Sequence, residues 1–263
     1  MTAKLSVSLI TYNAQRLLKN VLSAVAPIAD EIVIVDNGST DDTLEIAKEF
    51  GVKVFIEDWK GYGKQKQSCI AKCSGDWILA LDADEVLTPN SLEVIKRVIN
   101  SAQYSAYEIV RINYCFEKLV RHCFPDEYKI RLFKAGTANF SSALVHEKVE
   151  VADAAGVGRL REVQILHYTG VDLEDFVFKT HKYAITVARQ HYISGKRSNI
   201  FSIIFKPIFK FCKMYFFQLG FLDGVAGLIL SFNAANYKFI SYAQLYLLVS
   251  GSRARRAAGE PQE

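Results

Sequence analysis

The chain has 263 residues, of which 50% are hydrophobic, and a formal net charge of +4 at pH 7. This length suits one large domain or one domain with an appendage, and the lack of internal repeats excludes a repeat architecture. The cysteines are odd in number and form no CxxC pair, which argues against a zinc site and favours reduced, cytosolic thiols. Residues 1–4 lead directly into a predicted strand, without the apolar region of a signal peptide.

The first 82 residues alternate between apolar runs typical of strands and stretches with helical spacing of apolar residues. They predict strands at 5–10, 31–35, 52–56 and 77–81, and helices at 14–26, 44–50 and 65–73. Ser39 or Thr40 is a candidate cap for the second helix. The alternation predicts a mostly parallel, doubly wound α/β sheet. No GxGxxG follows the first strand and no Walker lysine loop is present, which excludes dinucleotide-binding and P-loop classes.

Residues 77–81 (WILAL) predict a strand buried on both faces, and three carboxylates follow it, from Asp82, Asp84 and Glu85. Side chains at the carboxyl end of a parallel strand lie where open α/β sheets bind ligands. On a continuing strand Asp82 and Asp84 would point to the same side, and two close carboxylates repel unless a cation lies between them. Their hard oxygen atoms suit Mg²⁺ or Mn²⁺. The alternative is a solvated acidic turn before the next helix.

Three segments, in this order and spacing, carry a family resemblance: residues 6–13 (SVSLITYN), 33–43 (VIVDNGSTDDT) and 79–85 (LALDADE). Together they resemble the family-two inverting glycosyltransferases of GT-A fold. The resemblance implies an α/β fold over residues 1–170, with a Rossmann-like, mostly parallel sheet flanked by helices, and a UDP-sugar donor. It assigns nucleotide-sugar binding to Thr11, Tyr12, Asn13, Asp36, Asn37, Lys66, Asp82 and Ala83.

The resemblance gives particular roles to two aspartates of this set. Asp36 would accept a hydrogen bond from the uracil ring, and Asp82 would lie near the ribose or the sugar. A carboxylate is a suitable acceptor for a ring N–H group. Lys66, together with Lys64, would add positive charge for the phosphates. The alternative is that both lysines lie on a solvated helix face.

The resemblance also implies a divalent cation, Mg²⁺ or Mn²⁺, which Asp84 would bind beside the donor diphosphate. His167 ends an apolar run and matches the position at which GT-A enzymes commonly carry an additional histidine ligand. Asp84 and His167 would then form a mixed oxygen and nitrogen site, completed by diphosphate oxygens and water. A satisfied structural histidine is the alternative for His167.

A second chemical stretch lies at residues 140–150 (FSSALVHEKVE). An inverting transfer needs one positioned base for the proton of the acceptor hydroxyl, and it needs no protein nucleophile. In the resemblance an acidic residue that ends a short motif at this place is the base, and Glu147 fits that position. The alternative is an exposed strand carboxylate paired with Lys148. His146 and Asp126 are weaker candidates for the base.

The segment between these two stretches combines regular and irregular patterns. A helix is predicted over 90–100, and strands over 106–112 and 128–133. Residues 114–126 are irregular and rich in aromatic and basic side chains, so they are either a loop that shapes the acceptor site or a covered loop. Arg131 is a candidate for contact with phosphate or acceptor, and its spacing does not decide between them.

The family can be narrowed by four segments: residues 77–87 (WILALDADEVL), 131–133 (RLF), 145–147 (VHE) and 167–168 (HY). They resemble bacterial lipopolysaccharide inner-core glucosyltransferases. The resemblance implies transfer of glucose from UDP-glucose to an inner-core heptose, so the acceptor would be a lipid-anchored saccharide. Two alternatives keep the fold: a glycosyltransferase that acts on polyprenyl phosphate, and a non-catalytic nucleotide-sugar-binding protein associated with the membrane.

The C-terminal third differs in composition from the rest of the chain. A helix over 173–192 is predicted to cross back over the sheet. Thirteen of the chain's 30 Phe and Tyr residues lie between Phe201 and Tyr246, and residues 196–256 hold nine Lys or Arg against one acid. We expect a helical extension over 171–250 and a disordered basic tail over 251–263.

The basic and aromatic residues of this extension predict its partner. Lys206, Lys210 and Lys213 share one helical face beside an aromatic one, which is the pattern of a helix that lies in a membrane interface. The expected location is therefore cytoplasmic and peripheral, on the anionic inner face of the cytoplasmic membrane. A helical subdomain packed on the sheet and a re-entrant insertion are the alternatives. Nucleic acid is not an expected partner, because the aromatics form apolar runs rather than a polar stacking platform.

Overall fold

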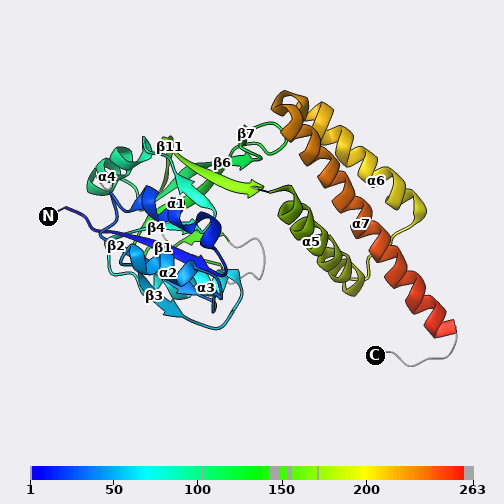
Figure 1. Cartoon of the computed structure of the whole chain (residues 1–263), viewed down its shortest axis with the longest axis horizontal. Coiled ribbons are helices and arrows are strands. Elements are labelled where there is room, and N and C mark those ends of the chain that lie inside the picture. Colours follow the sequence, from blue (N-terminus) through cyan, green and yellow to red (C-terminus); the bar gives the residue numbers. More distant parts are fainter. Residues whose placement is uncertain (1, 102, 142–147, 153–155, 171, 258–263) are drawn as a thin grey trace. The chain divides into compact units, whose positions relative to one another are not determined.

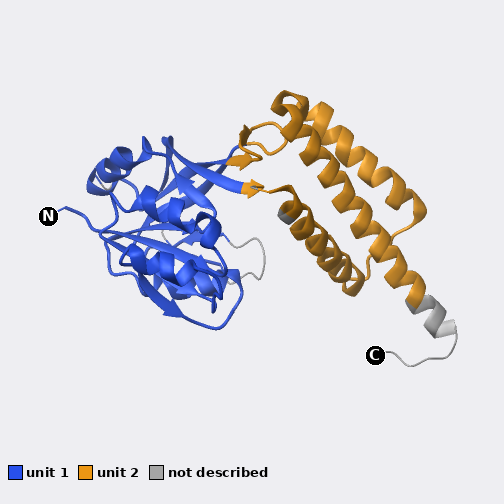
Figure 2. Ribbon diagram, in the orientation of Figure 1, with its two compact units in different colours: residues 1–112, 126–168 blue, residues 113–125, 169–263 orange. Residues whose placement is uncertain are grey.

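The computed structural model in Figure 1 describes residues 2–101, 103–141, 148–152, 156–170 and 172–257. The chain divides into two compact units (Figure 2). The first comprises residues 1–112 and 126–168, and the second comprises residues 113–125 and 169–263. The unit boundary near residue 170 lies close to the expected one. Residues 113–125, which were expected in the first domain, group with the second unit instead.

Four parallel strands form one half of the sheet of the first unit, in the order β3-β2-β1-β4. They are β1 (Leu5–Thr11), β2 (Glu31–Asp36), β3 (Lys53–Ile56) and β4 (Trp77–Asp82). β1, β2 and β4 are buried along nearly their whole length because both faces of the sheet are covered. The register aligns their carboxyl ends: Thr11 lies opposite Asp36, and Ile10 lies opposite Asp82. The predicted parallel arrangement is confirmed in this half.

Helices cover both faces of these strands. They are α1 (Gln15–Val25), α2 (Thr43–Glu49) and α3 (Tyr62–Ile70), and α4 (Ser91–Ser101) follows later in the chain. Helix α1 buries Leu18, Leu22 and Val25 against one face of the sheet, and α3 places Cys69 against Val33 and the other face. All four helices were predicted, and α3 begins three residues earlier than expected.

The predicted cap of the second helix is wrong. Neither Ser39 nor Thr40 caps α2, because the helix begins after Asp42. Ser39 instead donates its hydroxyl hydrogen to Asp36, at 2.6 Å. At the start of the helix, the carboxylate of Asp41 accepts a hydrogen bond from the backbone N–H of Thr43 at 3.1 Å. The serine is therefore part of the strand-end cluster and not part of the helix terminus.

The second half of the sheet continues from β4 in the order β8-β6-β11-β5. Its strands are β5 (Glu85–Leu87), β6 (Ala106–Cys115), β8 (Glu127–Lys134) and β11 (Val157–Gly170). The pairs β4–β8, β6–β8 and β11–β5 are antiparallel. β9 (Ala138–Phe140) and β10 (Val149–Val151) form a separate antiparallel pair. In this half, β5 follows the acidic turn and pairs with β11.

The segment expected to be irregular, residues 114–126, is partly regular. β6 continues to Cys115, and β7 (Lys118–Val120) pairs with it in an antiparallel hairpin. Residues 121–123 are held by Asp223, whose carboxylate accepts hydrogen bonds from their backbone N–H groups at 2.8–3.4 Å. These bonds, from residues about 100 positions apart, explain why the segment belongs to the second unit.

The second unit is helical. It contains α5 (Leu173–Ile193), α6 (Ile200–Cys212), the π-helical turn η1 (Lys213–Phe217), the short 3₁₀-helix η2 (Gly220–Asp223) and α7 (Gly224–Ala257). The sequence predicted the sheet as the neighbour of α5, whereas α5 packs along α7 within its own unit. Asn233 and Ser241 of α7 bond to Thr180 and Ala184 of α5 and fix this pairing.

The C-terminal helix is longer than expected. The predicted disordered tail over 251–263 is wrong for its first seven residues, since α7 continues to Ala257. Alanine and arginine are strong helix formers, so a growing helix extends through them. Among the described residues no single helix is long and apolar enough to cross a membrane. The pair Ile200–Phe217 and Gly220–Gly251, bent by 72°, meets the length and composition criteria only when the two helices are taken together.

Candidate active site

Asp36, at the end of β2, is the centre of a cluster of hydroxyl groups. Its carboxylate is fully buried and accepts from the hydroxyl of Thr11 at 2.6 Å. It also accepts from the backbone N–H and the hydroxyl of Ser39, at 2.7 and 2.6 Å. A carboxylate has about four acceptor positions, and these bonds occupy three of them. The structure thus brings Thr11 and Asp36 together as predicted, and it adds Ser39.

The loop after β1 is fixed to the same cluster. Asn13 has a φ of +48°, and its backbone N–H donates to the hydroxyl of Ser39 at 2.8 Å. Its side-chain oxygen accepts from the backbone N–H of Thr40 at 2.8 Å. Asn37 is tied to the end of β1 by a 3.0 Å bond from its N–H to the carbonyl of Thr11. Tyr12 is 59% exposed, which leaves its ring available for stacking on a ligand.

Asp82, the last residue of β4, is neutralised by two buried cations of the protein. Lys66 Nζ lies 2.7 Å from one carboxylate oxygen, and an Arg131 guanidinium nitrogen lies 2.8 Å from the other. Burial alone would raise the pKa of Asp82, but the charges of Arg131 and Lys66 hold that pKa well below its ordinary value. The interpretation of Lys66 as a solvated lysine is wrong, because Lys66 is only 8% exposed. The charge of Asp82 is thus balanced without a metal ion.

The ion pairs continue behind Asp82. Arg131 also contacts Glu85 at 2.5 Å, and Arg111 lies 3.5 Å from the same Glu85 oxygen. Glu85 is fully buried, so it depends on these two arginines for its charge balance. Arg131 was a candidate for contact with phosphate or acceptor, but its guanidinium binds protein carboxylates. The pairing of Glu85 with Arg131 and Arg111 was missed, because strand spacing in the sequence does not reveal which charged side chains meet across a sheet.

The acidic turn is different from the continuing strand that the sequence suggested. β4 ends at Asp82, and Ala83 and Asp84 form a turn before β5, so the two aspartates do not alternate along one strand. Asp84 is half exposed, and its carboxylate lies 3.6 Å from Nε2 of His167. The backbone also joins them, because the N–H of Tyr168 donates to the carbonyl of Asp84 at 2.9 Å.

The Asp84–His167 pair fits a divalent cation. Two ligand atoms that share one ion at its usual bond lengths lie roughly 3–4 Å apart, and the observed separation is 3.6 Å. The part of the chain that the structure describes holds no group of three or more His, Cys, Asp and Glu placed for a metal. Asp84 and His167 would therefore supply two ligands, and diphosphate oxygens and water the others.

Glu147, the predicted base, and His146 lie in residues 142–147, outside the described residues. The strands on either side of that segment are described. Ser141 N–H donates to the carbonyl of Lys148 at 2.8 Å, beside the β9–β10 pair. The ring of Phe140, at the end of β9, lies 5.0 Å from Lys66 Nζ, which in turn contacts Asp82. Asp126, the weaker candidate, is exposed.

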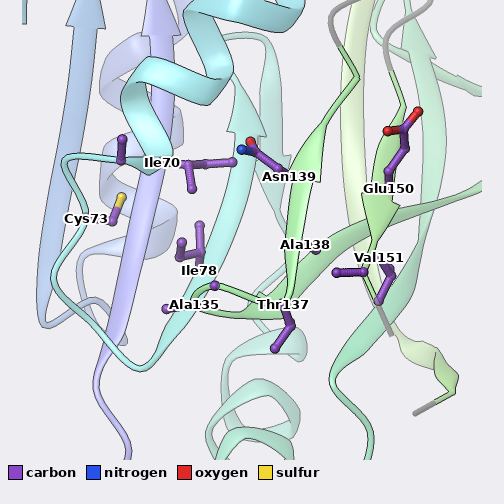
Figure 3. Close-up of a pocket in the computed structure, with 12 residues that line it drawn as sticks. Ile70, Cys73, Ile78, Ala135, Thr137, Ala138, Asn139, Glu150 and Val151 are labelled. Atoms are coloured by element: carbon purple, nitrogen blue, oxygen red, sulfur yellow. The ribbon is translucent and has the colours of Figure 1, made fainter. Parts of the chain in front are cut away.

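A cavity of about 620 Å³ lies elsewhere in the first unit (Figure 3). Its walls come from the end of α3, the start of β4 and the β9–β10 pair, with Cys73, Ile78 and Asn139 among the lining residues. Ile78 is near the amino end of β4, whereas Asp82 ends that strand. Of the predicted site residues that the structure describes, none lines this cavity. Burial raises the pKa of the Cys73 thiol to about 12, so it is not a reactive thiolate.

Comparison with known proteins identifies the class to which this site belongs. Residues 6–150 match the Glycosyl transferase family 2 profile. A glycosyltransferase of Rickettsia typhi, itself uncharacterized, is 32% identical over 260 residues, which cover 95% of this chain and 89% of the relative. The chain belongs to glycosyl transferase family 2, with an α/β fold of the GT-A type, and it is a glycosyltransferase.

A relative with a more particular name is the lipopolysaccharide core biosynthesis glycosyltransferase LpsC of Rhizobium meliloti. It is 28% identical over 254 residues, which cover 92% of each chain. The solved structure of residues 1–349 of S. aureus TarS aligns over 95% of this chain and 91% of that chain. The sequence identity is 17% and the TM-score is 0.48.

Proposed function

We propose that the protein transfers a hexose, glucose from UDP-glucose, to a hydroxyl of the lipopolysaccharide inner core with inversion at the anomeric carbon. One observation carries the proposal. The carboxyl ends of β1, β2 and β4 bring Thr11, Asp36 and Asp82 to one edge of the sheet, and Asp84 follows directly. The likeness to a relative named for lipopolysaccharide core biosynthesis, along nearly the whole of both chains, supports the acceptor.

We propose separate roles for the two parts of the donor. The Asp36 carboxylate receives the uracil N–H, and the exposed ring of Tyr12 stacks on the base. Asn13, Asn37 and Ala83 form the rest of this nucleotide pocket. Asp82 lies toward the ribose or the sugar, and Lys66 and Arg131 hold its carboxylate ionised and in place. Lys66 therefore acts on the donor through Asp82.

Asp84 and His167 would hold Mg²⁺ or Mn²⁺. Such an ion, when bound, neutralises the charge of the diphosphate that leaves. The chain's own contribution is to fix the two ligands. The bond from Tyr168 N–H to the Asp84 carbonyl links β11 to the acidic turn and sets the distance between them.

In the proposed transfer Glu147 takes the proton of the acceptor hydroxyl. The hydroxyl oxygen forms a bond to the anomeric carbon while the bond from that carbon to the diphosphate oxygen breaks, and UDP leaves with the electron pair. No covalent intermediate with the protein is needed. Phe140 ends the strand that precedes the segment with Glu147. Its ring lies beside Lys66, and Lys66 contacts Asp82. This position supports the proposed role of Glu147.

The direct test is to incubate the purified protein with separate UDP-sugars and truncated lipopolysaccharide, and to measure the mass of the acceptor. We expect one added hexose with UDP-glucose in the presence of Mg²⁺ or Mn²⁺, and no reaction after chelation. Asp84→Asn should lower transfer by about 100-fold or more, because the ligand for the ion is lost. Glu45→Gln, at an exposed carboxylate in α2, is the matched control and should leave transfer unchanged.

The base is tested with Glu147→Gln. This variant should still bind UDP-glucose, measured by calorimetry, and should lose transfer to the core hydroxyl. Asp126→Asn is the control, since Asp126 is the competing candidate. Undiminished transfer by Glu147→Gln would remove Glu147 from this role. Activity on polyprenyl phosphate that does not depend on Glu147 would indicate the alternative acceptor, because an ionised phosphate needs no base.

We further propose that the reaction takes place at the cytoplasmic face of the inner membrane, since a lipid-anchored acceptor would be presented there. Fractionation of cells that express the tagged chain tests this location. We expect the protein in the membrane pellet, with release by high salt.

A further inference from the structure

Helix α6 packs against α7, and one broad apolar side of it stays exposed among the described residues. The described structure buries none of its residues. Its large apolar side chains recur at spacings of three and four residues and are between 49% and 71% exposed: Ile200, Phe201, Ile204, Phe205, Ile208 and Phe209. Such spacing places them along one side of the helix. A contiguous apolar surface of this kind on a folded protein marks an interaction site.

Four side chains of α7 extend this surface. Val225, Phe232, Phe239 and Tyr246 recur every seven residues, so they share one side of α7, and their exposed fractions run from 68% to 36%. The rings of Phe211 in α6 and Phe232 in α7 lie 4.7 Å apart and join the two helices. We call the exposed apolar residues of α6 named above, together with these four of α7, the aromatic face.

Lysines lie on the same helical segments as the aromatic face, and the acid nearest to it in sequence is turned inward. Lys206 and Lys213 are exposed, and neither has a carboxylate partner among the described residues. Burial, followed by the charges of Lys238 and Lys213, lowers the pKa of Lys210, which indicates that positive charge is crowded here.

Asp223 is the one acid between residues 196 and 256. Its side chain is 4% exposed, and its carboxylate is bound by His122 at 2.8 Å and by three backbone N–H groups of residues 121–123. Its negative charge is therefore used inside the unit. The surface beside the aromatic face presents positive charge to its surroundings.

We infer that the aromatic face docks on an anionic lipid bilayer, with α6 and residues 225–246 of α7 lying in the headgroup region. Aromatic and aliphatic side chains beside lysines are the combination that interfacial helices use. A second copy of the chain is a poorer occupant, because a symmetric pair of these faces would bring two lysine groups together. The inference deepens the proposed function, since it supplies the contact with the membrane in which a lipid-anchored acceptor lies.

The test is co-sedimentation of the full chain with vesicles of phosphatidylglycerol and phosphatidylcholine, compared with phosphatidylcholine alone. We expect binding to the anionic vesicles, weakened by salt. Phe205→Ser with Phe209→Ser should reduce that binding by about 10-fold or more. Lys206→Glu with Lys213→Glu should do the same through charge, and should remove the salt dependence.

Two control variants match these changes on the first unit. Ile56→Ser alters an apolar side chain of β3 that is 67% exposed, and Lys4→Glu with Lys48→Glu makes the same change in net charge. Both should bind vesicles like the unchanged chain. Equal binding to neutral vesicles, equal loss in the controls, or retention on the vesicles after alkaline carbonate washing would each overturn the interfacial placement. Dimerisation without vesicles that Phe205→Ser with Phe209→Ser abolishes would show that a second copy is the occupant.

Transfer to a deacylated, water-soluble core oligosaccharide separates this inference from the proposed function. The variants of the aromatic face should keep that activity while they lose vesicle binding. An unchanged chain that transfers glucose but ignores anionic vesicles would overturn the docking face alone. An unchanged chain that binds vesicles but transfers no hexose to any core acceptor would overturn the proposed function and leave the docking face intact.

Discussion

The two units use charge in opposite ways. In the first, charged side chains at the strand ends pair with one another, and Lys66, Asp82, Arg131, Glu85 and Arg111 form a continuous chain of contacts of 2.5–3.5 Å. In the second, the lysines of α6 and η1 have no carboxylate partner among the residues described, and large apolar side chains are exposed.

This difference indicates that charged side chains have different roles in the two units. Paired and buried ions fix the positions of side chains, because a displaced partner leaves an uncompensated charge. Such rigidity suits a site that must hold carboxylates in place for a donor. Exposed cations beside apolar rings add little to the stability of their own unit, so they are available to a partner surface.

The largest expected change in the free energy of unfolding comes from breaking the chain of ion pairs in the first unit. Arg131→Met removes a cation from Asp82 and from the fully buried Glu85, and should lower the free energy of unfolding by about 3–5 kcal/mol. Urea denaturation followed by tryptophan fluorescence reports on this unit, because Trp59 and Trp77 both lie in it. Arg97→Met is the control: its ion pair with Glu162 is exposed, and its loss should change the free energy by less than about 1 kcal/mol. Equal effects would contradict the distinction between buried and exposed pairs.

The next effect concerns Asp223, whose side chain is buried in the second unit. Asp223→Ala leaves the backbone N–H groups of residues 121–123 without their acceptor, which should cost about 1–3 kcal/mol. Hydrogen exchange should accelerate in residues 121–123 and η2, while that of β1 and β4 stays unchanged. Glu174→Ala, at an exposed carboxylate of α5, should alter neither. Unchanged exchange in residues 121–123 would show that Asp223 does not hold this segment.

A third prediction uses pH. Burial raises the pKa of Glu31, but bonds from Lys53, Ser6 and Ser74 outweigh it and lower the pKa from 4.5 to about 2. A depressed pKa contributes stability that is complete above about pH 5 and is lost as the pH falls toward 2. Glu31→Gln should reduce the free energy of unfolding at pH 7 by about 1–2 kcal/mol and flatten its decline below pH 5.

The measurement for Glu31 is urea denaturation by tryptophan fluorescence at a series of pH values between neutral and acidic. Glu45→Gln is the matched control, because Glu45 is exposed at the start of α2. An equally steep acid decline in Glu31→Gln and in the unchanged chain would assign that decline to other carboxylates.

The smallest expected effect on stability comes from the aromatic face. Phe205→Ser with Phe209→Ser changes side chains that are 57% and 64% exposed, and should alter the free energy of unfolding by no more than about 0.5 kcal/mol for each residue. Circular dichroism of the helices during denaturation measures it. Phe133→Ala, in the core of the first unit, should cost about 3–5 kcal/mol by comparison. A large loss from the double serine variant would mean that these rings stabilise the second unit.

Much of the first unit could be predicted because its pattern is local. Apolar runs of strand length end in Thr11, Asp36 and Asp82, and parallel strands gather such ends at one edge. The pairing of Lys66 and Arg131 with Asp82 could not be predicted. It depends on α3 and β8 meeting β4, and no spacing along the chain records that contact. The same limit explains why Ser39 was assigned to a helix cap and why the pairing of Glu85 with Arg131 and Arg111 was missed.

In the second unit the composition predicted helices rich in aromatic and basic residues, but it did not predict that α5 packs along α7 or that residues 113–125 belong to this unit. An amphipathic helix needs an apolar neighbour, and its sequence does not say whether that neighbour is a sheet or another helix. Here α7 supplies the cover for α5, and Asp223 binds residues 121–123 to the same unit.

The amino-acid sequence by itself determined the four parallel strands and the helices α1 to α4. It also determined the acidic edge at Asp36, Asp82 and Asp84 and the basic, aromatic character of the C-terminal third. Periodicity and composition are properties of neighbouring residues, so these features could be predicted. Only the tertiary structure decided that Asp82 is neutralised by cations of the protein, whereas Asp84 lies beside His167. The charge of a carboxylate at a strand end is balanced by side chains from distant parts of the chain. Burial strengthens these charge interactions and makes an unpaired charge costly.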